Sequence, residues 1–339
     1  MNKVNVVYGS SSAMWGSGNV GGALLIENDL PAFDDSGSFT QSVSAVAASY
    51  GQYQAGVKSA LATRRFVLSV DAFGQSAKNN FVYEDNNAQE QRMNNARLQS
   101  GVGMLQAGYK INDRQTITAR AWYQQYYREI PRALFEAVSV KNQRDESLRT
   151  LLDWNRQGNK TSTYVKVAYI RDIVWYEDST VQVKAKNFTN QLYAEAGVNH
   201  RFNEHHKLLL FAPVLISSID RVSMGDRYEQ QRYALAAAYL YSAFDSKLNI
   251  SVNGRGELID DMKILLPGIN ASYDVTDYLQ LRANAQRTFR MPTLNELYYN
   301  PGGNPNLKPE KGWNEDAGYT LSVKRKLAVQ HSLSAYQRV

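Results

Sequence analysis

From Phe289 to Gly318 the chain reads FRMPTLNELYYNPGGNPNLKPEKGWNEDAG. The segment follows an alternating polar and apolar run and is rich in residues that form turns. Its four prolines and the pair Gly302-Gly303 restrict and turn the backbone, so we expect a loop that folds back on itself. Acidic and basic side chains of the segment are then expected close together: Glu296, Glu310 and Glu315 near Arg290, Lys308 or Lys311.

Apolar and polar residues alternate on both sides of this segment. Between Gln191 and Phe202 one face carries Leu192, Ala194, Ala196, Val198 and Phe202, and the other carries Gln191, Tyr193, Glu195, Gly197, Asn199 and Arg201. The same period recurs at 117–123, 163–169, 248–252, 279–288 and 319–323. Period two predicts β-strands, and strands of this length span a bilayer when tilted. Counting from Phe39, the sequence predicts about 15 strands.

The connections between these strands alternate in length. Short polar turns are predicted near Asn112-Asp113, Asn203-Glu204, Asp245-Ser246 and Val275-Thr276. Long links are predicted over residues 79–95, 128–148, 177–188, 220–229 and 290–312. Short turns on one rim and long loops on the other are typical of outer-membrane barrels, so the predicted fold is all-β, an antiparallel transmembrane β-barrel.

The composition of the chain argues against several classes of protein. No stretch of the 339 residues is apolar over the length of a membrane helix, and mean hydropathy is −0.46, which a barrel with a polar lumen tolerates. The net charge of +6 comes without a basic run, which argues against nucleic acid as a partner. The 22 tyrosines suit aromatic girdles at the two membrane interfaces.

A second segment, YGSSSAMWGSGNVGGALLIEN from Tyr8 to Asn28, is rich in glycine. Together with Phe289 to Gly318 it resembles TonB-dependent outer-membrane receptors, in the branch of the cobalamin and ferric-siderophore receptors. The matching plug residues are Gly9, Gly18, Gly21 and Gly22. The matching barrel residues are Arg290, Pro292, Glu296, Asn304, Pro305, Asn306, Leu307, Pro309 and Glu310. Ala23-Leu24 and Glu27 depart from the family's usual pattern.

The resemblance implies how the chain is divided. Residues 1–30 would be the C-terminal end of a plug domain, and residues 31–339 a partial barrel. Family barrels close at about 22 strands, so about seven strands are expected beyond this chain, together with a signal peptide, the rest of the plug and the segment that contacts TonB. An open sheet leaves unpaired edges in lipid, so this chain alone is not expected to make a working barrel.

The resemblance also implies a function. The intact protein would lie in the cell outer membrane and use energy from the TonB complex to take up a large, scarce nutrient, either a small molecule or a metal chelate such as a ferric siderophore or cobalamin. The family also includes haem receptors, and the sequence does not choose among these ligands. No enzyme is predicted, because no serine stands at a suitable spacing from His200.

Two alternatives from other classes stay open. A passive outer-membrane porin needs no plug, so the segment Tyr8 to Asn28 argues against it. A soluble β-rich binding module would place Leu192, Ala194 and Val198 in a protein core instead of against lipid.

Candidate ligand contacts are aromatic and basic residues near the strand tops: Tyr126, Arg128, Trp175, Tyr298 and Tyr299. Rings and guanidinium groups grip large, partly anionic chelates by stacking, cation–π contacts and hydrogen bonds. The alternative for the aromatic residues is an interfacial girdle. For the segment Phe289 to Gly318 the favoured interpretation is structural, shaping the barrel wall and the base of the loop.

Metal sites have weaker signals. The loop from Asn79 to Asn95 offers hard oxygen donors of the kind that calcium prefers, Glu84, Asp85, Asn86, Asn87 and Glu90, but without EF-hand spacing. A solvated acidic loop is the favoured interpretation, with calcium as the alternative. His205-His206 lie in a predicted short turn, where a polar turn is favoured over a metal site. No other cofactor is predicted.

Overall fold

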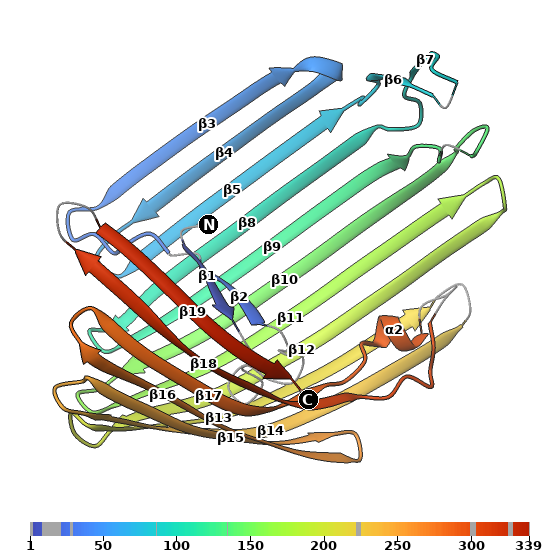
Figure 1. Cartoon of the computed structure of the whole chain (residues 1–339). Helices are drawn as coiled ribbons and strands as arrows, with labels where there is room; N and C mark the ends of the chain where they lie inside the picture. Colours follow the sequence, from blue (N-terminus) through green and yellow to red (C-terminus); the bar gives the residue numbers. More distant parts are fainter. Residues whose placement is uncertain are drawn as a thin grey trace.

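The computed structural model describes residues 3–8, 22–27, 30–85, 87–133, 135–221, 225–298, 303–324 and 328–338. One antiparallel sheet of 15 strands dominates it, and the sheet curves strongly (Figure 1). Its strands are β3 (Ser38–Ala48), β4 (Gln52–Ala62), β5 (Phe66–Ala77), β8 (Leu98–Asn112), β9 (Gln115–Ile130), β10 (Lys141–Gln157), β11 (Thr161–Asp178), β12 (Val183–Arg201), β13 (His206–Arg221), β14 (Asp226–Ala243), β15 (Leu248–Ile259), β16 (Met262–Thr276), β17 (Leu279–Arg290), β18 (Glu310–Lys324) and β19 (Ala328–Arg338).

The order of strands in this sheet is the order of the chain. Each strand pairs with its sequence neighbours, except that β5 pairs with β8 across an excursion containing the short strands β6 (Val82–Glu84) and β7 (Glu90–Arg92). The edges are β3 and β19, which do not pair with each other among the described residues. The partial antiparallel barrel of about 15 strands predicted from the sequence is therefore confirmed.

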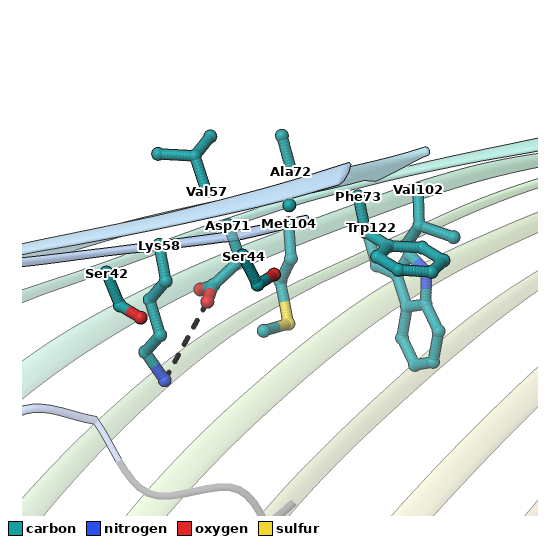
Figure 2. Close-up of a pocket in the computed structure, with 11 residues that line it drawn as sticks. Ser42, Ser44, Val57, Lys58, Asp71, Ala72, Phe73, Val102, Met104 and Trp122 are labelled. Carbon is teal, nitrogen blue, oxygen red and sulfur yellow. Dashed lines mark ion pairs between the residues drawn. The ribbon is translucent and has the colours of Figure 1, made fainter. Parts of the chain in front are cut away.

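The two faces of the sheet differ in chemistry. Figure 2 shows Lys58, Asp71 and Met104 on one side of the strands, with Val57 and Ala72 on the other. The antiparallel registers carry this division across the sheet, because directly paired residues share a face. We call the concave face with Lys58 and Asp71 the inner face, and the opposite face the outer face.

The outer face carries an apolar band. On β13 it shows Leu208, Leu210, Ala212, Val214 and Ile216 at alternate positions. At a rise of about 3.4 Å per residue this run covers about 27 Å, or about 20 Å in height at a tilt near 40°, close to the apolar band of membrane barrels. Leu235 and Leu265, which share this face, are 65% and 61% exposed. Large apolar side chains left bare in this way mark a surface that contacts lipid or another protein.

The connections separate by end of the sheet. The links at 63–65, 113–114, 158–160, 202–205, 244–247 and 277–278 are all short and lie at one end. The opposite end holds the β6–β7 excursion, the link 131–140 and the link 291–309, which contains helix α2 (Leu294–Tyr298) (Figure 1). We call this second end the loop end.

Three predicted long links are wrong in extent. The links are shorter than predicted: 131–140 in place of 128–148, 179–182 in place of 177–188, and 222–225 in place of 220–229. A further short link at the loop end, residues 260–261, joins β15 to β16. The hairpins continue past the apolar band, as in the pairing of Lys184 with Glu177. Beyond the membrane both faces of a hairpin meet water, so the ladder continues although the alternation that reveals a strand is lost.

The segment before the barrel lies in two parts. β1 (Lys3–Tyr8) and β2 (Gly22–Glu27) form a small antiparallel sheet of their own. Gly22 begins β2, whereas Gly9, Gly18 and Gly21 fall outside the described residues, so the plug motif stays a prediction. The following residues pack on the inner face, where a Cβ added at Gly108 would lie 3.3 Å from Leu30. The described residues hold no helix long and apolar enough to cross a membrane.

Candidate ligand cavity and signature loop

Helix α2 is a single turn fixed by its own first residues. The Thr293 hydroxyl accepts a hydrogen bond from the Glu296 amide at 3.2 Å, and Glu296 Oε2 accepts one from the Thr293 amide at 2.7 Å. This reciprocal arrangement is a capping box, which satisfies amides that a helix start otherwise leaves unpaired. The Thr293 amide, followed by the Arg290 guanidinium, holds the pKa of Glu296 below its ordinary value.

Arg290 ties the loop to the sheet. Its Nη1 lies 3.0 Å from Glu296 Oε1 in α2, and its Nη2 lies 2.8 Å from Glu310 Oε1 at the start of β18. Arg338 of β19 approaches the other oxygen of Glu310 at 3.6 Å. One guanidinium thus joins the end of β17, the helix and the start of β18, which confirms the predicted proximity of Glu296 and Glu310 to Arg290. Glu315 is exposed and does not join this pair of contacts.

Tyr298 anchors the other side of the loop. Its ring stacks on that of Tyr228 with 3.7 Å between centroids and 7° between planes. Its carbonyl accepts a hydrogen bond from Arg221 Nη1 at 2.8 Å, and the Arg221 guanidinium lies 5.2 Å from the Tyr228 ring. The loop between β17 and β18, the link 291–309 that we call the signature loop, is therefore fastened to the β13–β14 hairpin.

The remaining motif residues build turns. The Asn304 amide donates to the Glu296 carbonyl at 2.9 Å, and the Asn304 side chain accepts from the Asn306 amide at 3.0 Å. The Leu307 amide donates to the Asn304 carbonyl at 3.2 Å, and Pro292 is buried. Pro305 and Pro309 belong to the same turn-rich run. These contacts support the structural interpretation of the segment.

A cavity of about 640 Å³ lies under α2, against the inner face. Its lining is mostly polar and comes from β9 to β14 and the start of α2: Gln124, Asp145, Glu146, Ser147, Arg149, Asp172, Ile173, Val174, Asn187, Thr189, Gln191, Leu215, Ser217, Gln230, Arg232, Thr293, Leu294 and Asn295. We call it the lumenal cavity. Its volume falls in the range of sites for small molecules and cofactors.

The carboxylates of the lumenal cavity already have partners. Asp145 is paired with Arg128 at 2.7 Å, and Asp172 accepts a hydrogen bond from the Ser147 hydroxyl at 2.5 Å. Arg149 instead lies over the ring of Trp122, 5.5 Å from its centroid. A cation held on a ring leaves its remaining donors free for an anionic group.

A second cavity, of about 450 Å³, lies beside Trp122 on the inner face (Figure 2). Phe73, Val102 and Met104 line it with Trp122, and Lys58 and Asp71 face each other across 3.7 Å at its other side. Trp122 contacts both cavities through its ring and its cation partner Arg149. The inner face thus offers an apolar surface next to a polar one.

The structure brings together only part of the predicted ligand set. Tyr126 and Arg128 lie at inner-face positions beside the lumenal cavity, with Tyr126 directly opposite Asp145. Trp175 occupies the outer face, where Lys186 lies over its ring, so it does not join them. Tyr298 serves the loop anchor, and Tyr299 falls outside the described residues.

Sequence reasoning missed Arg149, Gln230 and Arg232. All three lie on long strands, and Arg232 donates to Gln230 at 2.7 Å. The sequence contains a signal that could identify them, because charged or amide side chains at the inward positions of an alternating strand face the lumen. The sequence favours loop residues instead, because their aromatic side chains are more conspicuous than single polar residues on a strand.

The candidate metal residues have other roles where they are described. Asp85 Oδ1 accepts from the amides of Asn87 and Gln89 at 2.9 and 3.0 Å, and these bonds lower the pKa of Asp85. His205 and His206 bond to Ser242 and to the Tyr239 hydroxyl. Within the described part of the chain no three metal-binding side chains cluster. Asn86 lies outside it, and loop calcium stays a prediction.

An open antiparallel wall with an apolar outer band, a polar inner face and a loop folded over the lumen defines one class of protein, the membrane β-barrel. Within that class, the chain belongs to the TonB-dependent receptor-like β-barrel family, whose sequence model matches residues 32–338. The family predicted from the two motifs is therefore confirmed. The proposed division at residue 30 stays a prediction.

Individual relatives agree with this assignment. The chain is 41% identical over 66 residues to the vitamin B12 transporter BtuB of Photobacterium profundum, covering 20% of this chain and 10% of that protein. The copper transporter OprC superposes with a TM-score of 0.78 at 14% identity, covering 98% of this chain and 58% of that chain. The siderophore receptor PirA of Acinetobacter baumannii gives 0.78 at 14% identity, covering 99% and 57%. The ferric enterobactin receptor PfeA of Pseudomonas aeruginosa gives 0.76 at 14% identity, covering 99% and 57%.

Proposed function

We propose that the chain is part of an outer-membrane receptor that takes up a large, scarce nutrient with energy delivered through TonB. The observation that carries the proposal is the lumenal cavity, which is lined by the inner face of a wall of this family and bordered by α2 of its signature loop. The relatives named for vitamin B12 and for siderophores support a large ligand, either a ferric siderophore or cobalamin. Lipid of the outer membrane covers the outer face.

Within the lumenal cavity, Arg149 is the residue that we assign to an anionic part of the ligand. The carboxylates Asp145 and Asp172 beside it are neutralised or hydrogen-bonded. The guanidinium of Arg149 can therefore pair with an anionic group of the ligand. Tyr126 and Arg128 flank the cavity and complete the proposed contact set. Trp122 would offer its ring to an apolar or aromatic part of the same ligand.

The two alternatives make different demands on the molecule. A passive porin requires an open channel, and the fastening of α2 to the β13–β14 hairpin over the lumenal cavity supports an occluded lumen instead. A soluble module requires the outer face to be covered by protein, whereas Leu192, Leu235 and Leu265 are exposed. Both observations favour the receptor.

The test uses the complete receptor that contains this chain, expressed in cells deleted for their own receptors, with and without TonB. Uptake of labelled ferric enterobactin, ferric citrate, haem and cyanocobalamin is measured separately. Saturable uptake of one of them that needs TonB supports the proposal, whereas uptake that continues unchanged without TonB indicates a porin. Failure to bind any of them, with the protein correctly inserted, overturns the proposal.

A matched pair of variants connects the result to the cavity. Arg149→Gln is expected to weaken binding of an anionic ligand by about 10- to 150-fold, since hydrogen bonds to charged groups contribute about 1.5–3 kcal/mol. Arg227→Gln is the control, because Arg227 lies on the outer face and is paired with Asp220 and Glu229. Equal affinity in the two variants would remove Arg149 from the site.

A further inference from the structure

Basic side chains form a continuous arc at the end of the sheet that carries the short links, which we call the short-turn end. Neighbouring turns there are joined by backbone hydrogen bonds: the Gln157 amide donates to the Arg114 carbonyl at 2.7 Å, and the Arg201 amide donates to the Lys160 carbonyl at 2.8 Å (Figure 1). Arg201 also pairs with Lys207 across the β12–β13 ladder. Arg114, Lys160, Arg201 and Lys207 therefore follow one another along this end, and we call them the basic rim.

The cations of the basic rim lack acidic partners. Asp113, the acid of the β8–β9 turn, is paired with Lys110 at 3.7 Å. Among the residues that the structure describes, no carboxylate lies within 4.0 Å of any of the four rim cations. All four side chains are exposed. Like charges side by side repel one another, so an anionic partner would stabilise the arc.

A cavity of about 420 Å³ lies at one end of the arc. Arg201 and Lys207 line it, and its described lining contains a single acid, Glu204. Amide side chains such as those of Asn249 and Asn270 add donors and acceptors to its wall. The volume falls in the range of pockets that hold small ligands, so the cavity has room for one or a few side chains of a peptide.

The position of the basic rim distinguishes a protein partner from the surrounding lipid. Arg201 and Lys207 form a pair on the inner face, because the adjoining pair, His200 with Leu208, belongs to the outer face. Their side chains therefore border the mouth of the lumen and not the bilayer.

The charge is also confined to one half of the short-turn end. The links 244–247 and 277–278 of the other half carry Asp245 and Asp277 with Lys247 as their one cation. Lipid head groups would surround both halves alike, whereas a protein that docks from one side would meet only the basic half.

We propose that the basic rim and its cavity bind an acidic segment of a protein that receives the transported nutrient. The proposal rests on the proposed function, in which the nutrient leaves the lumen at the short-turn end. Carboxylates of the segment would pair with Arg114 and Lys160, and one would enter the cavity between Arg201 and Lys207, where a guanidinium can bind it with two hydrogen bonds. Complementary charge also speeds the encounter of two proteins, which suits brief docking for transfer.

The test uses the complete receptor in neutral detergent and a fluorescein-labelled peptide of alternating Glu and Ser, with fluorescence anisotropy as the readout. The wild type is expected to bind this peptide, more weakly as salt rises, and not to bind the same peptide with Gln in place of Glu. An exposed ion pair contributes up to about a fivefold change in affinity, so the double variant Arg201→Gln with Lys207→Gln is expected to bind about 5- to 25-fold more weakly.

Two further variants separate the basic rim from net charge and from folding. Lys184→Gln with Lys263→Gln removes the same charge from exposed positions at the loop end and is expected to bind like the wild type. Arg201→Lys with Lys207→Arg keeps the charge of the rim and is expected to retain most of the affinity, which a loss of folding would not allow.

Three results would overturn the proposal. They are equal peptide affinity in the Gln double variant at Arg201 and Lys207, equal binding of the Gln peptide by the wild type, and an equal loss of affinity in the loop-end variant. If the Gln double variant keeps its peptide affinity but retains less phosphatidylglycerol in native mass spectrometry, the rim contacts lipid and the proposal is wrong.

The proposed transport function fails separately. A receptor that takes up its nutrient through TonB but does not bind the acidic peptide would reject only the site at the basic rim. Rim-dependent peptide binding by a receptor that transports none of the tested nutrients would reject only the transport proposal.

Discussion

Replacing Glu296 with Ala should open the signature loop without unfolding the wall. The carboxylate accepts from the Thr293 amide at 2.7 Å and from Arg290 Nη1 at 3.0 Å. Loss of a helix cap costs about 1 kcal/mol. The ion pair adds less than about 1 kcal/mol, because Glu296 is 39% exposed and Arg290 is 32% exposed, so solvent screens their attraction.

The sum of about 1–2 kcal/mol corresponds to a factor of about 5–30 in the opening equilibrium of the loop. Hydrogen exchange of the complete receptor in detergent should therefore show the amides of residues 293–298 exchanging faster by that factor. Amides within β13 and β17 should be unaffected. Glu315→Gln is the matched control, since Glu315 belongs to the same segment but is exposed on β18.

Glu296→Gln separates charge from hydrogen bonding. The amide oxygen still accepts from Thr293, so this variant should lose only the contribution of the ion pair. In the wild type the folded pKa of Glu296 lies below its ordinary value of 4.5. The stabilisation is therefore complete above pH 4.5 and is lost as the pH falls through the lower, folded pKa, whereas the Gln variant should show no such loss. Unchanged protection of 293–298 in Glu296→Ala would refute this account of the loop.

Three further substitutions test the faces of the wall and the loop anchor. Ala194→Arg places a charge on the lipid side and should cost about 2–4 kcal/mol near the bilayer midplane, measured by unfolding in liposomes, whereas a soluble module would fail to fold in water. Gly197→Ala should cost about 1–3 kcal/mol in the same assay, because its Cβ would come within 2.5 Å of the Tyr164 hydroxyl and force that ring to move. Tyr228→Ala should lower the protection of Tyr298 and its neighbours by about 1 kcal/mol through loss of the stacked pair, with Tyr228→Phe as the control that keeps it.

The strands were predictable wherever one side of the sheet meets lipid and the other the lumen. There apolar and polar side chains alternate along the sequence, as Leu192 and Glu195 illustrate, and this alternation gives the count of about 15 strands. Prediction failed where the hairpins leave the membrane, because polar residues such as Lys184 and Glu177 then occupy both faces of a continuing ladder. Local composition does not distinguish such an extended hairpin from a loop.

The residues that we propose for ligand binding escaped prediction for a different reason. Arg149 meets Trp122 across the ladder, and the lumenal cavity draws its lining from six strands and a loop, so its members are brought together only by the pairing of strands and by the curvature of the sheet. A single strand shows that a residue faces the lumen, but not which residues from other strands stand beside it. Pairing across strands, and not residue type, makes this site.

The motif residues hold the signature loop in place, whereas other residues line the lumenal cavity. This difference explains why the family is easier to recognise from the sequence than the ligand. Arg290, Glu296 and Glu310 use their charges on one another, and Asn304 uses its side chain within a turn. Such residues fix the loop over the lumen whatever the ligand is, so they suit any receptor of the family and identify none in particular. Selectivity must then come from residues outside the motif, and in this chain we propose Arg149, which lies over the Trp122 ring between a polar cavity and an apolar one. A receptor built in this way can change its ligand through a few inward positions on its strands while its signature loop stays the same.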